Sequence, residues 1–388
     1  MRVLFLSTPQ AKDLLPMVPL AWALRANGHD VRIATSGPAL AVAGGLPVVD
    51  FGPADPGSAE AMPELAPGHR KMVWSRLRTV EEGWPVLGYV ASTFVDPMLR
   101  AAREFRPDLV VHSQLQGAGL VTAAALGVPA VEHGFGLLRT GRFYDELAGL
   151  VPATLDRLGM SAGDLTAVPR AVIDIAPPSM VEAQEGAWPM RHVPHNGGGV
   201  VPEDLRTRPE GRARVAVTLG SMGLIGPDAD AEAFLGRFLP LLGDLARRSR
   251  AEFVLIGIDP WHLDPTGSGG GVLSGGVRCL SGWVPLRELL DGCAAILHQG
   301  GAGTTLNALD AGLPQLAVPA VAPNFMHSVL LQDRGVGRWV TPDELDGEAI
   351  ERLLSDEGAR AAAREVREEM AGMPAPLSLV ERVEALAR

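Results

Sequence analysis

The sequence predicts an α/β fold with two domains, each built on an open, parallel β-sheet. Three observations support this prediction. The chain has 388 residues, which exceeds the size that one hydrophobic core usually serves. Short apolar segments alternate with helical segments in both halves. The second half then begins as the first did, with a strand that runs directly into a loop.

The first half opens with a β-α-β unit. We expect a buried strand over Arg2 to Ser7, a helix over Met17 to Asn27 that closes at Gly28, and a strand over Asp30 to Ala34. Strands joined by a helix in this way run parallel. The alternation continues with a strand over Asp108 to Ser113, a helix over Gly117 to Leu126 and a strand over Ala130 to Glu132.

An aromatic-bearing insertion interrupts this pattern from Phe51 to Phe94. Prolines and charges lie among its aromatic residues, and we expect it to be irregular. Long insertions in a compact domain often line a binding site, and Trp74 is the candidate contact. Core packing is an equally good interpretation of these aromatic residues.

The second half is set off by a stretch rich in Gly, Pro and charge, His195 to Arg212, which we interpret as a linker. A strand from Val215 to Leu219 follows and ends at Gly220-Ser221, whereas Thr266 to Gly276 is expected to be a surface loop. Two such domains facing each other would enclose a deep cleft. The remaining expected strands are Glu252 to Gly257, Arg278 to Leu280, Ala294 to Leu297 and Gln315 to Val318.

Composition excludes several classes of protein. The formal charge of −11 and the lack of a basic cluster argue against nucleic acid. Val3 to Leu6 is too short a run for a signal peptide, and no apolar run is long enough for a bilayer, so we expect a cytoplasmic protein without membrane contact. Cys279 and Cys293 lack neighbours at metal-binding spacing, and we predict reduced thiols and no metal site.

The most informative block runs from Gly282 to Pro319. A short strand ends at Leu297, and the glycine-rich turn Gly300 to Gly303 then leads into a helix opened by Thr304 and Thr305. Glycines allow a ligand to approach the backbone closely, and the free amides of a helix start attract an anion. The block therefore predicts a phosphate cradle.

The chain resembles glycosyltransferases of the GT-B fold, particularly bacterial enzymes that attach nucleotide-activated sugars to polyketides and other natural products. Plant UDP-glycosyltransferases are a more distant resemblance. The similarity covers nearly the whole chain and implies an acceptor domain over 1–200, a linker over 195–212, a donor domain over 212–370, and a final helix, about 372–388, that returns to the first domain. It is carried by the strings LSTPQAKDLLPMVPLAWALRANGHDVRIAT, RHVPHNGGG, VAVTLGS and GWVPLRELLDGCAAILHQGGAGTTLNALDAGLPQLAVP.

The resemblance implies roles for residues of the second domain. Trp283 would stack on the nucleotide base, with the backbone of Val284 pairing with the base edge, and Ser221 would approach the diphosphate and sugar. Trp283 could instead be a core aromatic, and Ser221 could simply cap a turn. The amides that would hold the diphosphate belong to Gly301, Ala302, Gly303 and Thr304.

Departures from the family pattern fall at the donor site. His298 matches the first histidine of the family's His-His-Gly-Gly string, but Gln299 replaces the second, phosphate-binding histidine. Asn307 replaces the acidic residue that often holds the ribose. Pro323-Asn324 replaces the acid-glutamine pair that grips sugar hydroxyls. A donor with fewer hydroxyl groups would suit these losses, which favours a thymidine-diphosphate deoxysugar.

Asp13 matches the position where the family usually carries its histidine base, three residues before Pro16. A carboxylate after the first strand could accept the acceptor's proton. It could also cap the helix expected near Leu14, and the two roles are compatible. His112, Glu132 and His133, at or just after strand ends, are the further candidates for contact with the acceptor, although a lone histidine is more often structural.

Together these observations predict an inverting, metal-independent glycosyltransferase whose only co-substrate is a nucleotide sugar, without a cofactor. The acceptor, a natural-product aglycone, could be attacked through oxygen or through carbon. A sugar-nucleotide epimerase of the same fold is one alternative, and a catalytically silent helper of a transferase is another. The sequence leaves open the oligomeric state, with a homodimer as one alternative, and the need for an activator protein.

Overall fold

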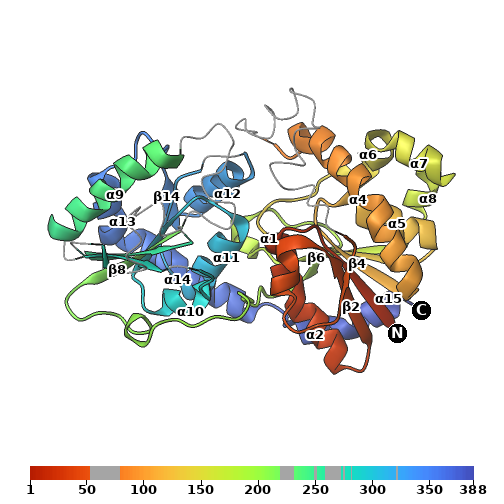
Figure 1. The fold of residues 1–388 in the computed structure, drawn as a ribbon, viewed down its shortest axis with the longest axis horizontal. Coiled ribbons are helices and arrows are strands. Elements are labelled where there is room, and N and C mark those ends of the chain that lie inside the picture. Colours follow the sequence, from red (N-terminus) through yellow and green to blue (C-terminus); the bar gives the residue numbers. More distant parts are fainter. Residues whose placement is uncertain are drawn as a thin grey trace. The chain divides into compact units, whose positions relative to one another are not determined.

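The computed structural model describes residues 1–52, 79–218, 231–248, 251–257, 272–273, 276–280, 282–319 and 322–388. The chain divides into two compact units (Figure 1). The first comprises Met1–Pro178, Glu182–Gly197 and Gly372–Arg388, and the second comprises Ser179–Val181 and Gly198–Ala371. Each unit contains a sheet flanked by helices, which confirms the predicted α/β class.

In the described part of the first unit, seven strands form one sheet in the order β3-β2-β1-β4-β5-β6-β7, and every pair is parallel. The apolar residues of its central strands β1, β4 and β5 are fully buried, as expected for a sheet covered on both faces. The strands are β1 (Arg2–Leu6), β2 (Asp30–Thr35), β3 (Val48–Asp50), β4 (Leu109–Ser113), β5 (Ala130–His133), β6 (Arg170–Asp174) and β7 (Trp188–Pro189).

Helices cover this sheet, and α4 corrects one prediction. The segment expected to be irregular as far as Phe94 is helical from Trp84, because Pro85 begins the helix favourably and every third or fourth residue from Ala91 onward is buried. The α4 helix packs mainly against α5, in the core formed with β1 and β4. The helices are α1 (Ala11–Leu14), α2 (Val18–Ala26), α4 (Trp84–Phe105), α5 (Gly117–Leu126), α6 (Phe143–Leu150), α7 (Pro152–Leu158), α8 (Ala162–Thr166) and α15 (Val380–Leu386).

The C-terminal helix α15 belongs to the first unit, in which both chain ends lie (Figure 1). His29 Nε2 lies 2.9 Å from Glu384 Oε1, which ties α15 to the turn after α2. The guanidinium of Arg382 lies 4.6 Å from the centre of the Trp188 ring, a favourable cation–π distance. These contacts fix the returning end of the chain to this unit.

The described part of the second unit holds a sheet in the order β10-β11-β9-β8-β12-β13-β14, parallel except for the β10–β11 pair. Residues 272–273, within the expected surface loop, form the short edge strand β10. The strands are β8 (Ala213–Thr218), β9 (Ala251–Ile256), β10 (Val272–Leu273), β11 (Val277–Leu280), β12 (Ala295–His298), β13 (Gln315–Ala317) and β14 (Gly337–Trp339). The helices are α9 (Ala231–Arg248), α10 (Leu286–Asp291), α11 (Ala302–Ala311), α12 (Ala322–Asp333), α13 (Gly347–Ser355) and α14 (Glu357–Gly372).

Part of the predicted linker is packed on the second unit. Val201 and Leu205 are each 1 % exposed and lie in the core beside β8 and β9. Arg214, 4 % exposed, pairs with Glu252 and donates hydrogen bonds to linker carbonyl oxygens. The composition of a linker therefore does not imply a loose chain here, because one buried guanidinium satisfies the carbonyl groups that a loop would otherwise leave unpaired.

Candidate active site

The glycine-rich turn lies between β12 and α11 in the second unit. Gly300 has φ +82°, a conformation that L side chains rarely adopt, and Gly301 is the N-cap of α11. The helix begins at Ala302, so the amides of its first turn have no intrahelical acceptors. Gly301 to Thr304 are only half-buried. The turn therefore presents donors and the positive end of a helix dipole to an anion.

His298 lies beneath this turn and is fully buried. Its Nδ1 accepts a hydrogen bond from the Gly300 amide at 3.0 Å, so the proton is on Nε2, which lies 2.9 Å from Gln315 Oε1. Burial lowers the pKa of His298 to about 4, which keeps the ring neutral. Both ring nitrogens are thus hydrogen-bonded within the protein, and the bond to the Gly300 amide fixes the conformation of the turn.

Gln299 and Asn307 adopt different positions around the turn. The amide of Gln299 lies against Gly301, where a Cβ atom would come within 2.6 Å of its Nε2. Asn307 is 4 % exposed and donates a hydrogen bond from Nδ2 to the Gly303 carbonyl at 2.7 Å. The buried Oε1 of Gln299 and Oδ1 of Asn307 have no hydrogen-bond partner among the described residues. Contact of either side chain with the nucleotide sugar therefore stays a prediction. Asn307 is less available for such contact, because its Nδ2 already donates to the Gly303 carbonyl.

Asn324 and Trp283 complete the described donor candidates. The Asn324 carbonyl oxygen would lie 2.7 Å from a Cβ on Gly300, so the first turn of α12 packs closely on the cradle. Trp283 is 46 % exposed, which rules out the interpretation as a core aromatic. Val284, beside it, packs against the core next to α10. Ser221 lies outside the described residues, as does Trp74 in the other unit.

Substitution of Gly300 by alanine tests the cradle. The new Cβ would lie 2.4 Å from Ser328 Oγ and would force a left-handed conformation. We expect a cost of about 1–3 kcal/mol and roughly tenfold weaker binding of thymidine diphosphate, measured by calorimetry. Gly335→Ala is the matched control, because Gly335 has a similar φ of +76° with no atom within 4 Å of its Cβ position. Equal effects of both substitutions on nucleotide binding would contradict the assignment.

Asp13 lies in α1 of the first unit, just after β1. It is 8 % exposed and accepts a hydrogen bond from the Thr8 hydroxyl, and its Oδ1 lies 3.2 Å from Lys12 Nζ. The Lys12 ammonium also lies 5.5 Å from the centre of the Phe135 ring. The helix begins at Ala11 with Gln10 as its N-cap, so the capping interpretation of Asp13 is wrong. The carboxylate is oriented by two neighbours, each of which contacts one oxygen.

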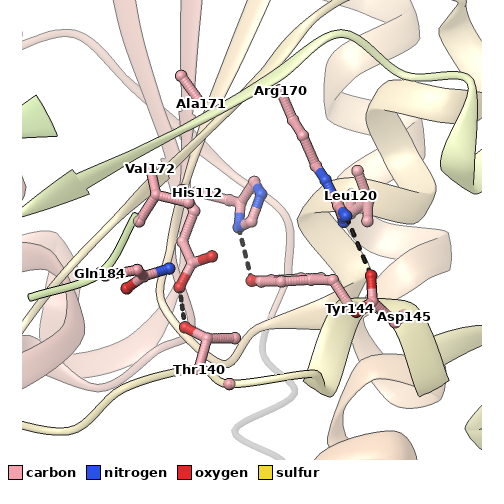
Figure 2. A pocket seen from close by; sticks show the side chains of 11 residues that line it. His112, Leu120, Thr140, Tyr144, Asp145, Arg170, Ala171, Val172 and Gln184 are labelled. Atoms are coloured by element: carbon pink, nitrogen blue, oxygen red, sulfur yellow. Dashed lines mark hydrogen bonds and ion pairs between the residues drawn. The ribbon is translucent and has the colours of Figure 1, made fainter. Parts of the chain in front are cut away.

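His112 and Glu132 come together in a cavity of about 140 Å³ in the same unit (Figure 2). They lie side by side on β4 and β5, and Tyr144 of α6 points toward His112, with its hydroxyl 3.4 Å from Nδ1. Burial raises the pKa of Glu132 to about 7 against the lowering effects of the Thr140 hydroxyl and Arg170, and burial lowers the pKa of His112 to about 4. The lining residues are His112, Leu120, Glu132, Thr140, Gly141, Tyr144, Asp145, Arg170, Ala171, Val172 and Gln184.

His133 does not join this cavity. It follows Glu132 on β5, and successive side chains of a strand point to opposite faces of the sheet. His133 is fully buried, and its Nδ1 donates to the Gly134 carbonyl at 2.6 Å. Burial lowers its pKa to about 4. The structure therefore separates His133 from His112 and Glu132.

The buried neutral histidines predict a loss of stability on mild acidification. Because burial lowers the pKa of folded His298 from 6.5 to about 4, the unfolded chain takes up this proton first as the pH falls. The contribution of neutral His298 to the free energy of unfolding is complete above about pH 6.5 and is lost as the pH falls from there to about 4. We expect the free energy of unfolding of the second unit, measured in urea, to fall by about 2 kcal/mol between pH 7 and pH 5 because of this residue.

His298→Asn should flatten that dependence, because asparagine retains an acceptor for the Gly300 amide but does not titrate. His29→Asn, in the first unit, is the control. The same acid response in wild type and His298→Asn would contradict a neutral, buried His298.

Sequence reasoning missed several residues that shape these sites. No motif pointed to Thr8 and Lys12 beside Asp13, to Gln315 beside His298, or to Tyr144 and Arg170 in the cavity. Gln315, Tyr144 and Arg170 lie on other elements than the residues they contact, and only the tertiary structure brings them together. Only Thr8 and Lys12 could have been found from the sequence, because both lie shortly before Asp13 in the segment after the first strand.

Within the described ranges, no group of three or more His, Cys, Asp or Glu side chains is arranged to hold a metal ion. None of the helices in those ranges is long and apolar enough to cross a bilayer.

Comparison with known proteins identifies the class. Residues 22–220 match the N-terminal domain, and residues 254–386 the C-terminal domain, of the erythromycin biosynthesis protein CIII-like family. The elloramycin glycosyltransferase ElmGT of Streptomyces olivaceus is 39 % identical over 396 residues, covering 99 % of this chain and 97 % of that protein.

Solved structures agree with the sequence comparison. The glycosyltransferase SnogD from Streptomyces nogalater is 38 % identical with a TM-score of 0.76, covering 100 % of this chain and 99 % of that one. The glycosyltransferase SsfS6 of Streptomyces sp. SF2575, complexed with thymidine diphosphate, is 28 % identical with a TM-score of 0.77 and covers 99 % of each chain. The molecule is a bacterial natural-product glycosyltransferase of the GT-B fold. It belongs to the erythromycin biosynthesis protein CIII-like family.

Proposed function

We propose that this enzyme transfers a deoxysugar from a thymidine-diphosphate donor to an aromatic polyketide aglycone, with inversion at the anomeric carbon. The observation that carries the proposal is the glycine turn over His298, in a chain that shares its fold with a relative solved with thymidine diphosphate. The 39 % identity to an elloramycin glycosyltransferase supports the choice of acceptor class.

The donor belongs to the second unit in this proposal. The diphosphate would bind the amides of Gly301 to Thr304, with Gln299 adding a neutral amide donor and Trp283 stacking on the base. The Pro323-Asn324 pair supports a deoxysugar, because it offers fewer acceptors for sugar hydroxyl groups than an acid-glutamine pair. Charge on the leaving diphosphate would be stabilised by the helix start, without a resident metal or cofactor.

The acceptor and the base belong to the first unit. An acceptor hydroxyl attacks the anomeric carbon while its proton passes to the Asp13 carboxylate. The bond from the anomeric carbon to the diphosphate oxygen breaks, and its electron pair leaves with thymidine diphosphate. One such displacement inverts the configuration. An electron-rich ring carbon could attack in the same way and then lose its own proton to Asp13.

A donor competition assay tests this function. The enzyme is incubated with an aromatic polyketide aglycone, a thymidine-diphosphate deoxysugar and UDP-glucose, and the products are read by mass and anomeric coupling. We expect the deoxysugar product with inverted configuration, and survival in hot acid would mark a carbon linkage. A clear preference for UDP-glucose, or a retained configuration, would overturn the corresponding part of the proposal.

The same assay separates the two alternative functions. An epimerase would convert or eliminate the donor without any aglycone present. A silent helper would give no turnover with any donor, and Asp13→Asn would leave the pathway product unchanged.

A further inference from the structure

The cavity lined by His112 and Glu132 has the size of one aromatic ring. Its volume is about 140 Å³, close to the roughly 150 Å³ of an engineered protein cavity that binds benzene. Among its lining residues, Gly141, Asp145 and Arg170 are exposed and form the rim, whereas His112 and Glu132 are buried and form the floor. Figure 2 shows His112, Asp145 and Arg170 around the cavity. A single ring therefore fits from the surface, and a fused polycyclic skeleton does not fit whole.

The floor of the cavity is arranged to receive a hydroxyl group. The Thr140 hydroxyl donates to Glu132 Oε1, and the described residues donate no hydrogen bond to the other carboxyl oxygen. His112 Nδ1 donates to the Ser113 carbonyl at 3.1 Å and also lies 3.4 Å from the Tyr144 hydroxyl, so Nε2 carries no proton and is left as an acceptor. A hydroxyl group both donates and accepts, and it therefore suits the carboxyl group of Glu132 in either protonation state.

The charges around the cavity favour a neutral ligand. Arg170 Nη2 lies 3.2 Å from Asp145 Oδ1, so the guanidinium at the rim is already paired. Ionised Glu132 would repel an anion, and no other cation lines the cavity among the described residues. Carboxylates and phosphates are therefore disfavoured against a phenol.

Hydrogen bonds connect the floor of the cavity to Phe135, whose ring lies beside Lys12. Gln114 Nε2 donates to the Thr140 hydroxyl at 3.1 Å, and Gln114 Oε1 accepts from the Phe135 amide at 3.5 Å. The ring of Phe135 in turn lies under the Lys12 ammonium, next to Asp13. One segment, residues 135–140, thus lines the cavity through Thr140 and contacts Lys12, the ion-pair partner of Asp13, through Phe135.

We propose that this cavity is a subsite for one hydroxylated aromatic ring of the acceptor, with the ring hydroxyl bound by Glu132. The assignment of the ring to an acceptor rests on the proposed function, but the binding of a ring does not. The subsite would select aglycones that end in a phenolic ring and would hold that ring while another position of the aglycone reacts.

Binding of phenol to the full chain tests the subsite directly. A dissociation constant of about 1 mM is expected for so small a ligand, measured by ligand-observed NMR, with toluene and benzoate each roughly fivefold or more weaker. Glu132→Leu should remove the preference for phenol over toluene, and Val172→Phe should abolish binding of both by filling the cavity. Glu146→Gln, an exposed carboxylate on α6, is the matched control and should leave phenol binding unchanged.

The outcomes test the subsite and the proposed function separately. Absent phenol binding, benzoate binding as tight as phenol, or phenol binding that survives both substitutions would overturn the subsite, even if sugar transfer is observed. Phenol binding that depends on Glu132 in a protein without transferase activity would support the subsite and defeat the proposed function. If both hold, Glu132→Leu should raise KM for a phenolic aglycone about tenfold or more with little change in kcat.

Discussion

Asp13→Asn is expected to lower kcat for sugar transfer by about 10²- to 10⁴-fold, the usual contribution of a positioned general base. Asparagine has nearly the same shape and retains an oxygen that can accept the Thr8 hydrogen bond, but it cannot take up the acceptor's proton. The Lys12 ammonium, 3.2 Å from Oδ1, would lose its ionic partner as well. The loss should appear in kcat, because the substitution lies in the first unit and leaves the glycine turn of the second unit intact.

Steady-state kinetics with the best donor and acceptor measure this effect. Affinity for thymidine diphosphate, read by calorimetry, should stay within about twofold of wild type. Asp30→Asn is the control, because Asp30 is an exposed carboxylate on β2 of the same unit. Wild-type kcat in Asp13→Asn would show that another group takes the proton. A parallel loss of nucleotide binding would mean that the substitution disturbs the fold.

Arg214→Met is expected to destabilise the second unit by about 3–5 kcal/mol, the usual cost of breaking a buried ion pair. The guanidinium is 4 % exposed and donates to the carbonyl oxygens of Leu205, Thr207 and Asp204 at 3.0, 2.7 and 3.1 Å. Removing it orphans these acceptors and leaves the Glu252 carboxylate without its partner. Methionine fills much of the space, so the loss reports on hydrogen bonds and charge more than on a void.

Hydrogen exchange of β8 and β9 peptides, read by mass spectrometry, measures the stability of the second unit separately from that of the first. Protection there should fall by the same free energy, and the segment around Leu205 should exchange first. Arg352→Ala is the control, since its pair with Glu348 is exposed to solvent and should contribute little to stability. A loss below about 1 kcal/mol for Arg214→Met would show that water replaces the guanidinium without penalty.

Local patterns predicted the fold class but not every element. The strand at Arg2 and the helix after it follow from short-range periodicity, and the structure confirms both. The helix that begins at Trp84 was mistaken for irregular chain, because its prolines and charges obscured a buried stripe that only packing against α5 reveals. The edge strands β3, β7 and β14 have two or three residues each, too few for a periodic signal.

The sequence by itself determined what depends on the backbone. Parallel strands follow from the β-α-β order, and the turn after β12 follows from the glycine at position 300, which adopts its φ of +82° without strain. Only the tertiary structure decided which side chains meet. The order β4-β5-β6 places His112, Glu132 and Arg170 around one cavity and turns His133 away, and β13 brings Gln315 to His298. Strand order and register determine these contacts between residues far apart in the chain, and no local sequence pattern predicts them.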